Sequence, residues 1–103
     1  MVDNMPAKLV IDERHPFPDG ISFAHIRIWK VPYPVEGSEH HYKYSLVYVV
    51  KGRCVLRYDN ERGKGDHRHW NDAESPYAFT NMSQLLADFR EDIERWRDEN
   101  RTT

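Results

Sequence analysis

The chain has 103 residues, of which 31% are charged and 39% are hydrophobic, and its formal net charge is −2. These values are typical of one soluble globular domain, and they exclude a disordered chain and a protein that is basic overall. No apolar run approaches the ~20 residues of a membrane span, and the first residues lack a secretory pattern. We therefore expect a single cytoplasmic domain over residues 1–103 that binds no membrane.

The N-terminal third of the chain has the pattern of a strand, a turn and a second strand. Residues 7–14 are a short apolar run consistent with an edge strand, and two prolines and an Asp-Gly pair over 15–20 indicate a turn. Residues 21–31 alternate between apolar and polar side chains, as in a strand with one apolar face. The polar face of this strand carries His25, Arg27 and Trp29.

The strongest strand signals lie over 42–50 and 53–59, which are rich in aromatic and β-branched residues. Only Lys51 and Gly52 separate them, which predicts a tight hairpin with Val50 opposite Arg53. Extended without interruption, this register divides the side chains between two faces. The apolar face carries Val47, Val49, Cys54, Leu56 and Tyr58, and the other face carries Tyr44, Tyr48, Arg53, Arg57 and Asp59 among Leu46, Val50 and Val55. Cys54, the single cysteine, is therefore expected to be buried.

The C-terminal part predicts a loop, a short strand and a helix. A glycine-rich loop with an H-x-H pair is expected over 60–72, and residues 77–80 suggest a fourth strand. Asn81, with Gln84 three residues later, is typical of a capping box that begins a helix. One apolar stripe follows over 82–100, made of Met82, Leu85, Leu86, Phe89, Ile93 and Trp96. We predict an α+β fold: an antiparallel β-sheet of about four strands, with the C-terminal α-helix packed on one face.

The sheet face that this helix leaves bare is where we expect the function to lie. It gathers cations, aromatic rings and histidines, a mix that binds single-stranded nucleic acid through phosphates and stacked bases. Glycine backbone N–H groups in the loop are a further expected anion site, with a lysine between them. The candidates for binding RNA or phosphate are Arg27, Arg57, Lys64, Arg68 and Tyr48.

The H-x-H pair suggests acid–base chemistry. His67 and His69 point the same way if their segment is extended, and imidazoles exchange protons near neutral pH. Metal-free RNA cleavage needs such a pair: the base takes the 2′-OH proton, and the acid protonates the 5′-oxygen that leaves. An arginine or lysine stabilises the charge on the phosphate oxygens. The candidate catalytic residues are His67, His69, His41, Tyr44 and Asp59, with Asp59 orienting a histidine or an arginine and His40 in reserve. The pattern does not assign which histidine is the base.

Two other interpretations remain open at this point. Asp66, His67 and His69, completed by His40 or His41, form a possible ligand set for Zn²⁺, Ni²⁺ or Mn²⁺ in a metal-dependent enzyme or regulator. A module without catalysis that binds a partner through its helix or a sheet edge is the third. The interpretation as a metal-free nuclease requires no cofactor.

The run Y-D-N-E-R-G-K-G-D-H-R-H over 58–69, with P-Y-A-F and L-L-A-D-F-R-E-D-I after it, resembles the TumE-type toxins. The resemblance extends from about residue 26 to residue 93. It implies the toxin component of a type II toxin–antitoxin module, which inhibits growth and forms an oligomer with a DNA-binding antitoxin. The predicted fold is also similar to that of RelE- and barnase-like toxins, which cleave RNA without a metal. We therefore interpret the chain as an endoribonuclease toxin that acts on RNA such as mRNA or tRNA.

Overall fold

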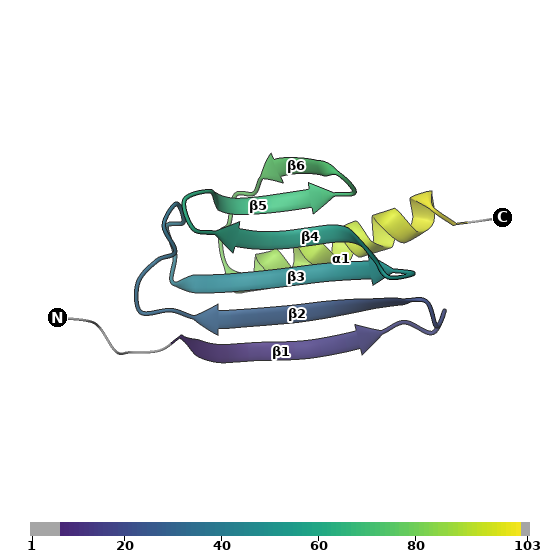
Figure 1. Cartoon of the computed structure of the whole chain (residues 1–103), viewed down its shortest axis with the longest axis horizontal. Coiled ribbons are helices and arrows are strands. Elements are labelled where there is room, and N and C mark those ends of the chain that lie inside the picture. Colours follow the sequence, from purple (N-terminus) through teal and green to yellow (C-terminus); the bar gives the residue numbers. More distant parts are fainter. Residues whose placement is uncertain (1–6, 102–103) are drawn as a thin grey trace.

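The computed structural model describes residues 7–101, which form a six-stranded antiparallel sheet and one helix (Figure 1). The strands lie across the sheet in chain order, so each strand pairs with the next. Their bounds are β1 Lys8–Pro16, β2 Ser22–Lys30, β3 Tyr42–Val50, β4 Arg53–Glu61, β5 Gly65–Trp70 and β6 Ala73–Pro76, and the helix α1 spans Met82–Glu99. The predicted fold class, an antiparallel sheet with a C-terminal helix on one face, is confirmed.

The sheet has six strands rather than about four because the predicted loop over 60–72 is mostly strand. Gly63 and Gly65 have positive φ angles of 82° and 77°, which turn the chain back so that β5 pairs with β4. Asn71, with φ 52°, begins a second tight turn that leads into β6. The predicted strand at 77–80 is wrong, since this segment has no regular secondary structure.

A β-bulge in the β3–β4 hairpin overturns the predicted register. Val50 lies opposite Arg53 as predicted, but the pairing shifts by one residue so that Tyr48 lies opposite Leu56. A one-residue shift moves every later side chain to the other face of its strand. The tyrosines and leucines of this hairpin therefore share the helix side, where Tyr44, Leu46, Tyr48, Leu56 and Tyr58 are buried. Arg57 and Asp59 lie on the opposite side, with Val47 and Val49.

Two further predictions on this hairpin are corrected by the same bulge. Tyr44 and Tyr48 were expected on the bare face of the sheet, and both belong to the hydrophobic core instead. Cys54 was expected to be buried, but it stands next to the bulge and is exposed.

The helix begins as the sequence indicates and covers one face of the sheet. The Asn81 side chain accepts a hydrogen bond from the backbone N–H of Gln84 at 2.8 Å, which confirms the N-cap. The Gln84 side chain bonds to Asp88 rather than returning to the cap, so the capping box is only half formed. Leu85, Phe89 and Ile93 are buried against the sheet, and burying each such side chain contributes about 1.5–3 kcal/mol.

The sheet thus has two unlike sides. We call the side that packs against α1 the covered face, and the opposite side the open face. The row Arg27, Ser45, Asp59 and His67 is matched residue by residue across β2 to β5 and lies on the open face. Among residues 7–101, no helix is long and apolar enough to cross a membrane.

Candidate functional site

Four polar side chains from β4 and β5 meet on the open face. Asp59 lies directly opposite His67 in the β4–β5 ladder, and Arg57 lies directly opposite His69. The two imidazole rings are 6.4 Å apart between centroids and nearly parallel, at 15°. The expectation that both histidines point the same way agrees with this geometry, because residues two apart in a strand share a face.

Close contacts between ionisable groups connect these side chains to one another and to β6. The Arg57 Nε atom is 3.5 Å from Asp59 Oδ2, and the His67 Nε2 atom is 3.3 Å from Glu74 Oε1. His67 is only 7% exposed, whereas the side chains of Arg57 and Glu74 are each 43% exposed. We call Arg57, Asp59, His67, His69 and Glu74 the histidine cluster.

The histidine cluster contains polar atoms that the protein itself leaves without partners. Arg57 Nε, Asp59 Oδ1 and His67 Nδ1 are buried and make no hydrogen bond, and they are the only such side-chain atoms among residues 7–101. A buried polar atom without a partner costs about 1–3 kcal/mol, so native proteins rarely keep one. Three in one cluster supply a donor, an acceptor and an imidazole nitrogen, which suits a polar ligand.

Two shallow pockets flank the cluster. One, of about 320 Å³, is lined by Lys64, His67 and Glu74 and by their neighbours in β5 and β6. The other, of about 300 Å³, is lined by Arg57, His69 and the turn between β5 and β6. Lys64 lines the first of these pockets together with His67, and its Nζ atom is 3.9 Å from Glu61 Oε2.

Three predicted site residues are instead structural residues of the covered face. Tyr44 donates a hydrogen bond to Asp66 at 2.6 Å, and burial, followed by that carboxylate, raises the pKa of Tyr44, so the phenol stays protonated and is no base. The Tyr48 hydroxyl accepts a hydrogen bond from Arg97 of α1 at 2.8 Å. Arg68 donates to Asp92 of α1 at 2.6 Å, and this bond raises the pKa of Arg68.

The glycine turn serves close packing rather than anion binding. The Gly63 N–H donates to the Glu36 carbonyl at 2.7 Å, and the Lys64 N–H donates to the Glu61 carbonyl at 3.0 Å. A Cβ atom on Gly65 would lie 2.7 Å from the Gly37 carbonyl oxygen, so the loop before β3 leaves no room for a side chain. The backbone N–H groups of Gly63 and Lys64 are therefore already used within the protein and are not free to bind a phosphate.

The alternative metal-ligand set is not assembled. Asp66 alternates with His67 along β5 and faces the other side, where it accepts hydrogen bonds from Ser38 and Tyr44 and pairs with His40. No group of three or more His, Cys, Asp or Glu residues within 7–101 is arranged to hold a metal ion. His41 lies in the β2–β3 loop with its Nδ1 atom 3.3 Å from the Val31 carbonyl, outside the histidine cluster.

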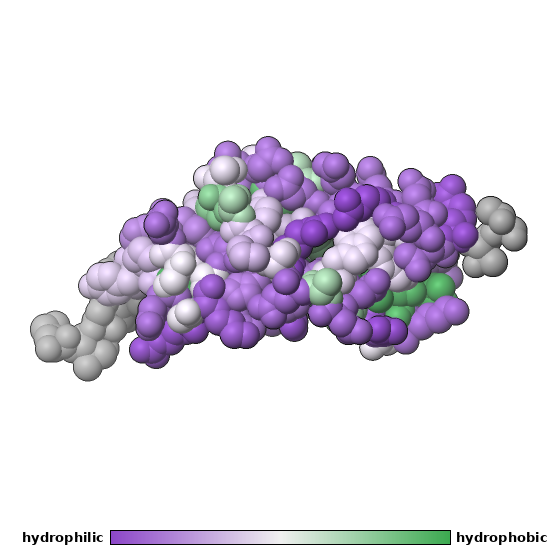
Figure 2. Space-filling view, turned by 90° about the horizontal axis from the view of Figure 1, so that it is seen from above, coloured by the Kyte–Doolittle hydropathy of each residue, from purple (hydrophilic) through white to green (hydrophobic). Residues whose placement is uncertain are grey.

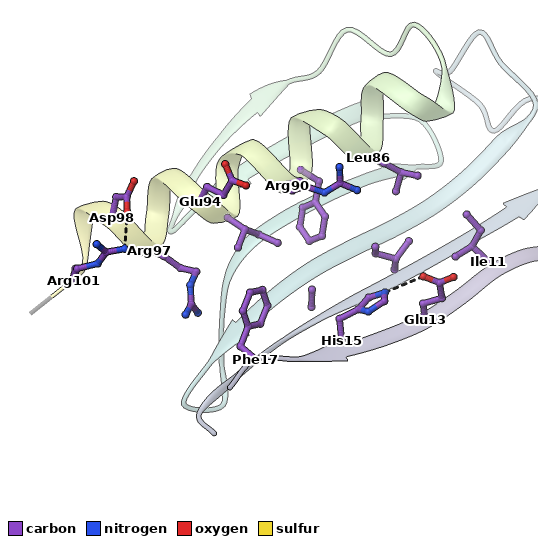
Figure 3. Close-up of a pocket in the computed structure, with 14 residues that line it drawn as sticks. Ile11, Glu13, His15, Phe17, Leu86, Arg90, Glu94, Arg97, Asp98 and Arg101 are labelled. Carbon is purple, nitrogen blue, oxygen red and sulfur yellow. Dashed lines mark hydrogen bonds and ion pairs between the residues drawn. The ribbon is translucent and has the colours of Figure 1, made fainter. Parts of the chain in front are cut away.

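A further cavity lies on the covered face and is lined by different side chains. This groove has a volume of about 650 Å³. Figure 3 shows that it lies between α1 and the strands β1 and β2. Apolar side chains line most of it, namely Ile11, Phe17, Ala24, Ile26, Leu86, Phe89 and Ile93. Charged residues such as Arg90 and Glu94 of α1 stand at its rim. This composition suits an apolar partner surface, and the histidine cluster lies on the opposite face.

The family model described as Toxin TumE matches residues 5–97. The chain belongs to the TumE toxin family. This membership confirms the family resemblance of the segment that forms β4, β5 and α1. No curated protein and no solved structure matches the chain.

Glu74 belongs to the histidine cluster of this TumE-family toxin but is not among the site residues predicted from the sequence. Glu74 reaches His67 because β6 folds back on β5, and the sequence pattern predicts no strand there. The signal that points to it is Asn71-Asp72, a two-residue turn pair that stands between H-R-H-W and A-E-S-P. A hairpin at this pair brings the only acidic residue of 73–76 beside the two histidines.

Proposed function

We propose that this TumE-family toxin is a metal-independent endoribonuclease whose acid–base pair is His67 and His69. The observation that carries the proposal is the set of buried atoms without partners, Arg57 Nε, Asp59 Oδ1 and His67 Nδ1, which lie beside two parallel imidazoles. A phosphodiester with a neighbouring 2′-OH offers the acceptors and the donor that these atoms lack.

The contact with Glu74 favours His67 as the general base. The Glu74 carboxylate lies 3.3 Å from Nε2, and its negative charge favours a tautomer of the neutral ring with the proton on that nitrogen. The neutral ring then has its lone pair on Nδ1, which is one of the atoms without a partner. In this proposal, Glu74 favours the tautomer that a base requires.

The remaining roles follow from position in the cluster. His67 Nδ1 takes the proton of a 2′-OH, the 2′-oxygen bonds to phosphorus, and the P–O5′ bond breaks as His69 protonates the 5′-oxygen. Arg57, opposite His69 in the ladder, turns its partly exposed guanidinium from Asp59 onto the phosphate oxygens. That movement opens the buried atoms to the substrate. The products are a 2′,3′-cyclic phosphate and a 5′-hydroxyl.

RNA cleavage by the purified toxin tests the proposal. We expect cleavage in the presence of EDTA, with 2′,3′-cyclic phosphate ends, and a rate lower by about 10²–10⁴-fold in His67→Ala and in His69→Ala. Both variants should fold normally and no longer arrest growth. His41→Ala is the matched control, since this exposed histidine lies outside the cluster and should retain activity.

Three outcomes would contradict the proposal. Growth arrest by both histidine variants would remove them from the mechanism. Cleavage that EDTA abolishes would favour a metal-dependent enzyme, and unchanged RNA ends during growth arrest would favour a module that acts by binding alone.

A toxin of this family requires a neutralising partner, and we propose a DNA-binding antitoxin that inserts an amphipathic helix into the groove beside α1. On the covered face, β1 and β2 extend beyond α1 and together span about 10 Å, which is the width of one helix. Arg90 and Glu94 stand at the rim of the groove without ion-pair partners among residues 7–101, which favours a helix with complementary charges.

Leu86→Glu, on the groove wall, should prevent neutralisation while the toxin still arrests growth, and normal neutralisation of this variant would contradict the assignment.

A further inference from the structure

The open face has an excess of positive charge away from the histidine cluster. Every strand carboxylate on this face within 7–101 has a cationic or imidazole partner: Asp12 with His25 at 2.7 Å, Asp59 with Arg57 at 3.5 Å, Glu61 with Lys64 at 3.9 Å and Glu74 with His67 at 3.3 Å. Arg14, Arg27 and Lys43, by contrast, form no ion pair with any carboxylate of residues 7–101. Since the whole chain carries −2, this concentration of cations is local.

Aromatic rings accompany two of these cations. The Arg27 guanidinium lies 4.9 Å from the centroid of the Trp29 ring, and that of Arg14 lies 3.7 Å from the Phe23 ring. Lys43 is the ladder neighbour of Trp29, so the indole stands beside two cations. A π-face next to positive charge is the arrangement that binds bases and phosphates of a single strand.

The strand register aligns this region with the histidine cluster. Arg27 pairs with Ser45, Ser45 with Asp59, and Asp59 with His67, so one row crosses β2 to β5. Three strand spacings separate its ends, which is about 14 Å. A nucleic acid strand whose phosphate lies at the histidines reaches Arg27 within a few nucleotides.

We propose that Arg27, Trp29 and Lys43 form a subsite for the single-stranded RNA that flanks the cleaved phosphate. The proposal rests on the endoribonuclease function and gives it a substrate class. The two cations bind phosphates, and Trp29 stacks on a base that only an unpaired strand exposes. Because every base has a π-face, the subsite adds affinity without a strong sequence preference.

Binding of an uncleavable RNA tests the subsite independently of catalysis. The probe is a 2′-O-methylated, fluorescein-labelled oligoribonucleotide of about eight nucleotides, measured by anisotropy over a range of salt concentrations. Arg27→Ala and Lys43→Ala should each lower the salt slope of log K by about 0.7. Trp29→Ala should weaken binding by about 5- to 150-fold. Arg90→Ala, at the groove on the covered face, and Tyr33→Ala, whose exposed ring lies in the β2–β3 loop, should bind as the wild type does.

Cleavage assays separate this proposal from the function on which it rests. The three subsite variants should cleave a dinucleotide at the wild-type rate and a longer strand with reduced kcat/KM. Wild-type affinity in all three variants, no binding by the wild-type protein, or equal binding of a duplex of the same sequence would overturn the subsite. Binding that depends on Arg27, Trp29 and Lys43 without any cleavage would instead support the subsite and refute the nuclease.

Discussion

The two faces of the sheet treat buried polar atoms in opposite ways. On the covered face, Tyr58 donates to Asp92, and the Asn60 side chain bonds to the backbone of Tyr44 and Tyr42. On the open face, three buried atoms of the histidine cluster make no hydrogen bond. The buried polar groups named on the covered face are therefore satisfied by hydrogen bonds that stabilise the fold. The open face leaves three buried polar atoms without hydrogen bonds, which lowers stability. The surface view in Figure 2 is mostly hydrophilic, with small apolar patches.

If the open face serves function rather than the fold, His67→Phe should lower RNA cleavage without lowering stability. The phenyl ring fills the space of the imidazole but exchanges no proton, so RNA cleavage should fall by about 10²–10⁴-fold. The substitution also removes a buried nitrogen without a partner, so the free energy of unfolding should stay equal or rise by about 1 kcal/mol. Urea denaturation and a cleavage assay on the same preparation check both parts. A marked loss of stability would show that His67 serves the fold.

Leu46 and Val47 offer a test of the two faces at neighbouring positions. Leu46 is fully buried on the covered face, so Leu46→Ala should lower the free energy of unfolding by about 2–5 kcal/mol. Val47 is half-buried on the open face, and Val47→Ala should cost about 1 kcal/mol or less. Urea denaturation measures both variants, and equal losses would contradict the division into a structural and a functional face.

Glu74→Gln should have a smaller effect, confined to activity. If the carboxylate holds the tautomer of His67, its loss should lower kcat by about 10- to 100-fold, the range for groups that orient a functional histidine. The 43% exposed side chain should contribute little to stability. The pH profile of kcat should change shape, whereas Glu61→Gln, on the same face beside Lys64, should leave that profile unchanged. An unaltered profile in Glu74→Gln would remove Glu74 from the mechanism.

The sequence predicted most of the long strands and the helix correctly, but it predicted the register of the β3–β4 hairpin wrongly. Periodicity found β2, β3, the start of β4 and the helix with its Asn81 cap, because these signals are local. Periodicity did not reveal the bulge at Val55, because one extra residue in a strand produces no repeating pattern in the sequence. The bulge nevertheless changes which residues of β3 and β4 share a face beyond it. Tyr44 and Tyr48 were misplaced for that reason. The prediction for Arg68 is wrong because it rests on a loop over 60–72, whereas alternation along the strand β5 places the Arg68 side chain on the side of α1.

Part of the candidate site could be predicted because two of its residue pairs depend only on the spacing along one strand. His67 and His69 share a face in any extended segment, and Arg57 and Asp59 share one in the same way. Glu74 depends on β6 returning to β5, a long-range feature that the weak pattern A-E-S-P does not reveal. The Gly65 turn was interpreted as an anion site because the approach of Gly37 is invisible in sequence.

The smallest expected effect concerns the turn that ties β1 and β2 to the end of α1. The backbone N–H of Ile21 and the hydroxyl of Ser22, with a smaller contribution from Arg97, lower the pKa of Asp19 from 3.8 to about 2. A carboxyl with a lowered pKa stabilises the fold above its unfolded value, and this contribution is lost as the pH falls through the folded value. Asp19→Asn should therefore lower Tm by a few degrees above about pH 4, and the difference from the wild type should close as the pH approaches 2. Asp72→Asn, at a fully exposed turn position, should show no such pH-dependent gap, and a gap for Asp19→Asn that persists at pH 2 would show that its charge is not the cause.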